Sequence, residues 1–136
     1  MLAIPSVIND TAEPLLSGRL TATLRQRLLA AGFSIDSRAQ DEGMYLEGRV
    51  TRFSDQVLAF DGAGVASHRR VVLVLHVTLR DGDGIVWDSP LTIGSASYAV
   101  GSDATRNRDN KDRAVAEAAV DLSEQLLLTL ISLEPR

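Results

Sequence analysis

The 136-residue sequence contains no cysteine, which excludes disulfides, thiolate metal sites and a cysteine nucleophile. It also lacks any stretch of the roughly 18 apolar residues that a membrane-spanning helix needs. The first residues, MLAIPSVI, have neither the basic start nor the long apolar run of a secretory signal peptide. We therefore expect the chain as given to be soluble.

The sequence has no excess of positive charge. Its 14 basic residues are outnumbered by 18 acidic ones, and the formal net charge is −4. A chain with this balance does not present the general basic surface that nucleic-acid phosphates require. We expect no nucleic-acid partner.

Motifs that carry catalysis or bind cofactors are absent from the sequence as well. His68 and His76 are its only histidines, and neither has acidic or cysteine neighbours at a metal-ligand spacing. There is no G-x-S-x-G elbow, and the glycines at 62–64 and 82–84 lack the Lys-[Ser/Thr] ending of a phosphate loop. The sequence therefore predicts a protein that is not an enzyme and that has no metal site and no cofactor.

Two amphipathic segments predict helices. Hydrophobic residues make up 45% of the chain and charged residues 24%, as in ordinary globular domains, so we expect one domain over residues 1–136. The first helix ends at Gly32, and the second follows a polar stretch at 101–112. Each has apolar residues at three- and four-residue spacing. In the first they are Leu16, Leu20, Leu24, Leu28 and Ala31, widened by Leu15 and Leu29, and in the second Val115, Ala119, Leu122, Leu126, Leu130 and Leu133.

The segment between the helices alternates as β-strands do. Strands are predicted near 44–51, 56–60, 71–79, 85–87 and 91–100, with short extended pieces before the first helix and at Phe33 and Ile35. Phe53 breaks the alternation, which indicates a bulge near Arg52, and Gly94 indicates a second one. Asp81-Gly82-Asp83-Gly84 is typical of a hairpin turn.

This order predicts an α+β fold, a two-layer sandwich. A strand and a helix come first, three or four strands linked as hairpins follow once neighbouring segments are joined, and a second helix ends the chain. Both helices would pack on one face of a mostly antiparallel sheet of about four strands. The odd positions of 71–79 are all apolar and would face the helices. The opposite face, left uncovered by the chain, would carry a mixed set of side chains: Val72, Val74, His76 and Thr78.

Basic residues gather in the polar stretch at 101–112, which we expect to be a loop that can start the last helix at any of several capping residues. Arg106, Arg108, Lys111 and Arg113 lie close together in an otherwise acidic chain. They could bind phosphate groups of a lipid head group or the acidic surface of a partner. The alternative is a solvated loop whose charge is neutralised by Asp103, Asp109 and Asp112.

Several segments together resemble the LptE family of outer-membrane lipoproteins, which belong to the lipopolysaccharide transport system. They are Ile4-Pro5 with Asn9-x-Thr11-x-Glu13-Pro14, Leu20-Thr21-x-x-Leu24-Arg25, Leu46-Glu47-Gly48-Arg49-Val50, the hairpin at 71–87 and the leucine-rich last helix. The resemblance covers nearly the whole chain.

The resemblance implies an α+β sandwich that plugs the lumen of the β-barrel protein LptD, assists assembly of that barrel and contributes to lipopolysaccharide delivery. It implies contact of lipopolysaccharide with Arg106 and Arg108, and with Lys111 nearby. The uncovered sheet face at Val72, Val74, His76 and Thr78 would suit the barrel partner. Family members carry a lipidated N-terminal cysteine, so an anchor to the periplasmic side of the outer membrane is expected upstream of this chain.

A second resemblance remains open. LpoB-like and CsgG-like envelope lipoproteins also open with a strand, an Asn-containing break and a helix. A protein of that group would regulate a cell-wall synthase or form a secretion ring.

Overall fold

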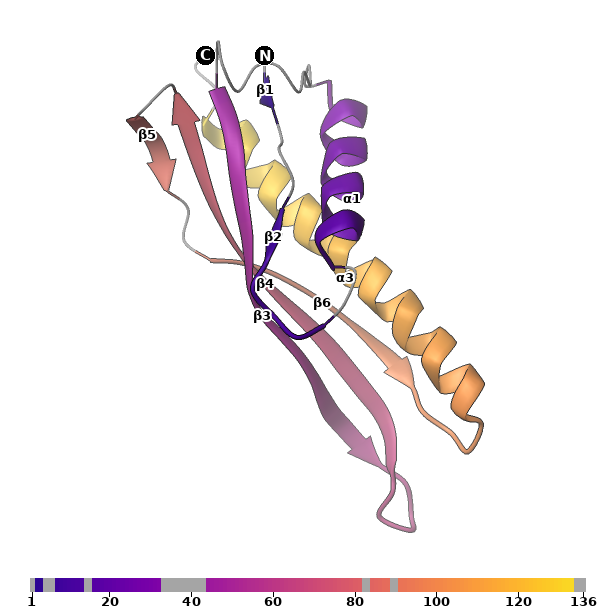
Figure 1. The fold of residues 1–136 in the computed structure, drawn as a ribbon. Helices are drawn as coiled ribbons and strands as arrows, with labels where there is room; N and C mark the ends of the chain where they lie inside the picture. Colours follow the sequence, from indigo (N-terminus) through magenta and orange to yellow (C-terminus); the bar gives the residue numbers. More distant parts are fainter. Residues whose placement is uncertain are drawn as a thin grey trace.

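The computed structural model describes residues 2–3, 7–13, 16–32, 44–81, 84–88 and 91–133. In chain order its elements are β1 (Leu2–Ala3), β2 (Ile8–Asn9), α1 (Leu16–Ala30), β3 (Met44–Phe60), β4 (Ala66–Asp81), β5 (Gly84–Asp88), β6 (Thr92–Ala99) and α3 (Ala104–Leu133). Figure 1 shows the two helices beside one long, twisted sheet. The predicted α+β class is confirmed, whereas the predicted extended piece at Phe33 and Ile35 lies outside the described residues.

A long antiparallel hairpin of β3 and β4 forms the centre of the sheet. The short strands β1 and β2 both run parallel to β3 along its other edge. On the far side of β4, β6 pairs with the first half of the strand and β5 with its end. Six strands therefore occupy only four positions across the sheet, because two edge positions are each shared by two short strands.

Strand β3 is continuous where the sequence predicts two strands. The bulge predicted near Arg52 is present, since the pairing with β4 shifts between Val50 and Arg52. Pairing then resumes and continues to Phe60. The extra residue allows both Val50, which is fully buried, and Phe53, which packs against the core, to face the helices.

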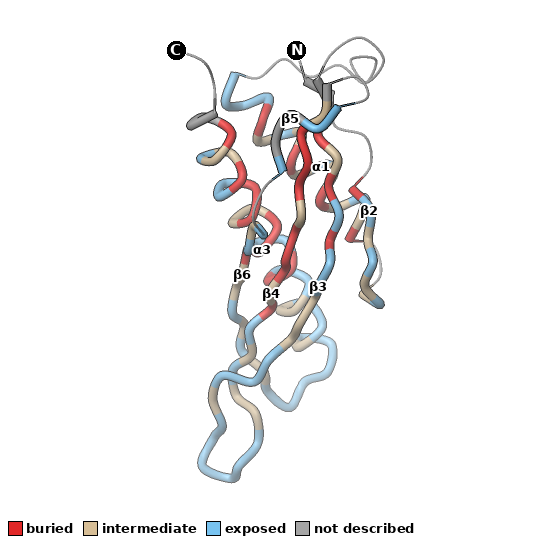
Figure 2. The backbone as a smooth tube through the Cα atoms, turned by 90° about the vertical axis from the view of Figure 1, so that its left-hand side faces the viewer, coloured by how far each residue is buried: buried red, intermediate tan, exposed pale blue. Residues whose placement is uncertain are grey.

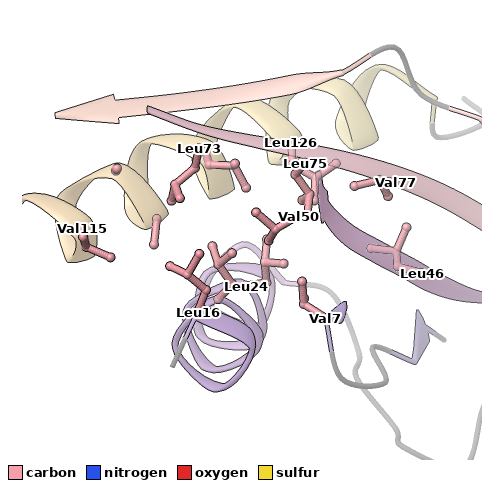
Figure 3. Close-up of a cluster of buried hydrophobic side chains, with 14 of the residues drawn as sticks. Val7, Leu16, Leu24, Leu46, Val50, Leu73, Leu75, Val77, Val115 and Leu126 are labelled. Atoms are coloured by element: carbon pink, nitrogen blue, oxygen red, sulfur yellow. The ribbon is translucent and has the colours of Figure 1, made fainter. Parts of the chain in front are cut away.

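The core lies between the sheet and the two helices (Figure 3). Leu16, Leu20, Leu24 and Leu28 of α1 are buried, as are the predicted α3 residues from Val115 to Leu130, and they meet the odd-numbered residues of β4. These sheet residues are Val71, Leu73, Leu75, Val77 and Leu79. Leu29 and Ala31, which the sequence also placed on the apolar side of the first helix, are exposed instead. The buried side chains are almost all apolar, as the hydrophobic effect requires for a core of this kind.

Gly94 does not form the bulge that the sequence suggested. Strand β6 passes through it in regular pairing with β4, opposite Leu73. The reason for glycine is the close approach of α3, because a Cβ at this position would lie 2.4 Å from the carbonyl oxygen of Ala118 and 2.5 Å from Cβ of Leu122. The absence of a side chain thus permits the contact between β6 and α3.

The last helix begins at Ala104, inside the polar stretch at 101–112. Asp103 caps it, since its Oδ1 accepts hydrogen bonds from the backbone N–H groups of Thr105, at 3.0 Å, and Arg106, at 3.3 Å. Asp103 is thus the capping residue at which the helix starts, among those that the sequence left open. The residues from Ala104 onward form the first turns of α3, an extension of the helix beyond the core.

Candidate functional site

The sheet face turned away from the helices carries the residues that the sequence placed there. We call it the outer sheet face and define it by Val72, Val74, His76 and Thr78 of β4 together with their cross-strand neighbours. The pairing places Glu47, Arg49, Arg52, Asp88 and Ile93 beside them. These neighbours come from three other strands, so only the strand register could identify them.

Exposure on the outer sheet face is uneven. Val74 and Thr78 are each only 8% exposed, while Ile93, which lies opposite Val74, is 54% exposed. Val72 and His76 are of intermediate exposure. The apolar area offered by this face is therefore provided less by the predicted valine and threonine positions than by the neighbouring edge strand.

Ion pairs cross the outer sheet face. Nη1 of Arg49 lies 2.6 Å from Oδ2 of Asp10, and Nε of Arg80 lies 2.6 Å from Oε2 of Glu47. The hydrogen bond to Asp10 and the negative charge of that carboxylate raise the pKa of Arg49 above its ordinary value. Both arginines are thus matched by an acid of this chain.

His76 has an acidic partner that the sequence did not suggest. Its Nε2 lies 2.6 Å from Oδ1 of Asp88, and Thr78 donates a longer hydrogen bond, 3.4 Å, to the same oxygen. Asp88 is twelve residues further along the chain and reaches His76 through the pairing of β4 with β5. The cluster ties the short edge strand to the sheet.

Two arginines on the same face have no acid beside them. Arg52, opposite Val74, and Arg70, opposite Gln56, are exposed, and neither forms an ion pair with any described residue. The outer sheet face therefore combines uncompensated positive charge with the exposed apolar side chain of Ile93. Such a mixture suits a protein interface more than a solvated sheet.

The basic residues at the start of α3 divide into two kinds. Arg106 and Arg108 are exposed and form no ion pair within the described part of the chain. Lys111 instead lies 3.4 Å from Glu13 and 5.5 Å from the centre of the Phe53 ring. Lys111 therefore joins α3 to the segment before α1 and to β3, while the two arginines remain available to a ligand.

A polar cluster that the sequence did not single out joins three strands. Asp55 of β3 accepts a hydrogen bond from the Tyr98 hydroxyl of β6, at 2.7 Å, and another from Arg69 Nε of β4, at 3.0 Å. Burial, followed by the hydrogen bond to Asp55, raises the pKa of Tyr98 to about 12. The hydrogen bond to Asp55 is also the main reason that the pKa of Arg69 is raised. A phenol held neutral in this way acts as a structural donor.

The described residues show no metal-binding constellation. They contain no cluster of three or more histidine or acidic side chains placed to hold a metal ion. Neither α1 nor α3, the helices of the described part, combines the length and apolar character needed to cross a membrane.

Solved structures with the same fold include bacterial lipoproteins. The rare lipoprotein B of Shewanella oneidensis is 14% identical, with a TM-score of 0.66 over 96% of this chain and 94% of that one. A minor lipoprotein of Acinetobacter baumannii is 15% identical, with a TM-score of 0.66 over 96% and 90%. A PelC dodecamer of Paraburkholderia phytofirmans is 17% identical, with a TM-score of 0.52 over 91% and 86%. At these identities the likeness shows a shared fold.

A search of curated proteins found no match. A family model does match, and it spans residues 1–130, which include both helices nearly to the end of α3 and every strand. Its description is LptE, lipopolysaccharide-assembly. The order of elements, the lipoprotein structures of the same fold and this match agree with the resemblance that the sequence segments indicated: the chain belongs to the LptE family of lipopolysaccharide-assembly lipoproteins.

Proposed function

We propose that this protein is the plug of an LptD-type outer-membrane barrel, assists assembly of that barrel and contributes to delivery of lipopolysaccharide to the outer membrane. The observation that carries the proposal is the family match over residues 1–130. The outer sheet face supports it, because a sheet face with exposed Ile93 and uncompensated Arg52 is suited to a protein partner. The chain acts by binding, and we propose no catalytic step.

The partner test is co-expression of this protein with the cognate barrel, followed by purification through a tag on the barrel. We expect a stable complex. The double variant Arg52→Glu/Ile93→Glu should reduce the yield of this complex, because it reverses the free positive charge of the outer sheet face and replaces its exposed apolar side chain by a carboxylate. Leu29→Glu on α1, where Leu29 is 57% exposed, is the matched control. Failure of the wild-type protein to co-purify would refute the plug.

We propose further that Arg106 and Arg108 contact the phosphate groups of lipopolysaccharide. Both side chains are exposed at the start of α3, and guanidinium groups bind phosphate through paired hydrogen bonds. Lys111 is held by Glu13 and Phe53 and supports this end of the helix. Its contribution to lipid binding would be indirect.

Charge reversal tests the lipid contact. Arg106→Glu and Arg108→Glu should each weaken lipopolysaccharide binding by about tenfold, as expected for loss of one charge-assisted contact and introduction of repulsion. Arg113→Glu is the control, because Arg113 is exposed on the same helix about two turns further on. Binding measured with immobilised lipopolysaccharide should be unaffected in the control. Equal binding by all three variants would remove this site.

We propose that the mature protein is held at the periplasmic side of the outer membrane by a lipid anchor upstream of residue 1. Membership of a lipoprotein family supports this placement. Fractionation of cells that express the natural gene, with and without substitution of an upstream lipidation cysteine, tests it. Release of the protein from outer-membrane fractions by that substitution is the expected result.

A ring-forming envelope lipoprotein is the second candidate. The fold of a PelC dodecamer matches 91% of this chain, so the same architecture is compatible with assembly into a large oligomer. The mass of the purified protein in solution separates the two functions. A plug should be monomeric without its barrel, whereas a ring subunit should form a large assembly by itself.

A further inference from the structure

The far part of the β3–β4 hairpin has an open strand edge. On its outer edge β3 is paired with β1 at Met44 and Tyr45 and with β2 at Arg49 and Val50. The hydrogen bond from Asp10 N to Val50 O, 3.0 Å long, is the last backbone hydrogen bond along that edge among the described residues. From residue 51 to Phe60, no strand of the described residues pairs with this edge. Roughly every second residue there directs its backbone N–H and C=O away from β4.

At the opposite edge of the sheet, backbone groups of β6 are hydrogen-bonded to side chains of α3. On β6 the backbone N–H of Ser95 donates to Asp121 of α3 at 3.0 Å, and the carbonyl of Ala99 accepts from Asn110 at 3.1 Å. Side chains of α3 therefore satisfy hydrogen-bonding groups of the backbone along this edge. Proteins commonly protect edge strands in such ways, because an open edge is a template for another strand. Along residues 52–60 of β3 the described residues show a single such contact, from Arg69 Nη2 to the backbone carbonyl of Asp55 at 2.9 Å. The uncharged end of the strand, residues 56–60, has none among them.

The open edge coincides with exposed apolar side chains. Residues 56–60, QVLAF, contain no charge, and their exposed fractions are 39% for Val57, 44% for Leu58 and 65% for Phe60. Val65, across the tip, is 60% exposed. Figure 2 shows this end of the hairpin extending beyond the buried part of the molecule, with exposed residues along both strands. A strand that is apolar and exposed on an unpaired edge favours pairing with another strand.

The tip itself is held in one conformation. Asp61 Oδ1 accepts hydrogen bonds from the backbone N–H groups of Ala63, at 2.9 Å, and Val65, at 3.0 Å. The backbone N–H of Asp61 donates to the Val65 carbonyl at 2.8 Å. Gly64 adopts a φ of 78°, which a side chain would disfavour. The edge is therefore preorganised, which lowers the entropy lost on binding.

We propose that residues 52–60 of β3 form a β-addition site that takes an extended segment of the barrel partner as a further strand of the sheet. The inference rests on the proposed plug function and specifies how the partner is held. Insertion of the tip into lipid hydrocarbon is disfavoured, because the unpaired backbone groups of β3 would then lie where no water can satisfy them. A partner strand pairs with these groups and covers Leu58 and Phe60 at the same time.

Hydrogen exchange measured by mass spectrometry tests the proposal directly. The isolated protein, the protein with anionic phospholipid vesicles and the purified complex with the barrel are compared. In the complex, about half of the amides in residues 52–60 should exchange about tenfold more slowly, because alternate amides acquire a partner. Amides of β4 in residues 68–70 should change little, since this part of the strand already lies between β3 and β6.

Substitution provides the second measurement. The double variant Leu58→Lys/Phe60→Lys should fold normally, because both side chains are exposed, and should bind the barrel about tenfold more weakly, because lysines on an edge oppose strand addition. Leu29→Lys/Leu128→Lys is the matched control, with side chains 57% and 65% exposed on the two helices. It removes similar exposed apolar area elsewhere and should bind as the wild type does.

The outcomes separate the two proposals. Absence of any complex would refute both the plug and the β-addition site. A complex in which the amides of residues 52–60 exchange as in the isolated protein would overturn only the β-addition site. Protection caused by vesicles alone would assign the tip to lipid, and protection in the isolated protein would assign the edge to this chain or a second copy. Either result would overturn this inference.

Discussion

Replacement of Gly94 by alanine tests the account of how α3 packs on the sheet. The added Cβ would lie 2.4 Å from the Ala118 carbonyl oxygen, 2.5 Å from Leu122 Cβ and 2.6 Å from Leu122 N. Ordinary contacts of a Cβ begin at 3.4 Å. All three atoms are backbone or Cβ atoms, so rotation of a side chain cannot relieve the overlap. Strand β6 and helix α3 must instead separate by about 1 Å, an amount that packed interiors resist.

The cost of this separation is large relative to the stability of a domain. Overpacking of a well-filled core typically costs about 1–3 kcal/mol, and we expect the upper end of that range because Leu122 and Ala118 are fully buried. A loss of about 3 kcal/mol would lower the midpoint of thermal unfolding by about 10 °C in a chain of this length. The hydrogen bond from Ser95 N to Asp121 would also be strained.

Thermal and urea unfolding followed by far-ultraviolet circular dichroism provide the assay. Gly18→Ala is the matched control, because Gly18 lies in α1 and has no atom within 4 Å of an added Cβ. The control should be stabilised by up to about 1 kcal/mol, since alanine has the higher helix propensity. If Gly94→Ala unfolds within about 0.5 kcal/mol of the wild type, as a neutral surface change would, the packing argument is refuted.

Two further predictions concern the polar contacts around β6. Tyr98 has a folded-state pKa of about 12, above the value of about 10 for an unfolded tyrosine, so its contribution to stability is present below pH 10 and is lost as the pH rises toward 12. The phenolate absorbance of Tyr98 is measured as the difference between the ultraviolet pH titrations of the wild type and Tyr98→Phe. This absorbance should rise near pH 12, and a rise centred near pH 10 would contradict the prediction. Asp121→Ala leaves the Ser95 N–H without its acceptor and should lower the free energy of unfolding by about 1–3 kcal/mol. Asp121→Asn, which retains an oxygen, should recover most of that loss in urea unfolding, and equal losses in both variants would argue against the hydrogen bond.

The candidate functional surfaces were only partly predictable. The alternation at 71–79 identified which β4 residues face outward, because side chains alternate strictly along a strand. It did not show that Val74 and Thr78 would be almost covered or that Ile93 would be exposed beside them. Those properties depend on which strands become neighbours and on their register, information that one strand's sequence does not contain.

The polar contacts between distant segments could not be predicted at all. Asp55 meets Tyr98, 43 residues away, and Lys111 meets Glu13, 98 residues away. Each of these side chains is unremarkable in its local sequence, where an acid or a lysine is usually solvated. Only the sheet order and the docking of α3 bring them within hydrogen-bond distance.

Local patterns alone determined the two amphipathic helices, the main strands, the bulge near Arg52 and the α+β class, because each depends on the period of apolar residues within one segment. The tertiary structure decided why residue 94 is glycine, which arginines lack an acid and which strand edge stays open. Those features depend on contacts between segments far apart in the chain. They set the surfaces through which this lipoprotein would meet its partner, because recognition uses the arrangement of residues in space.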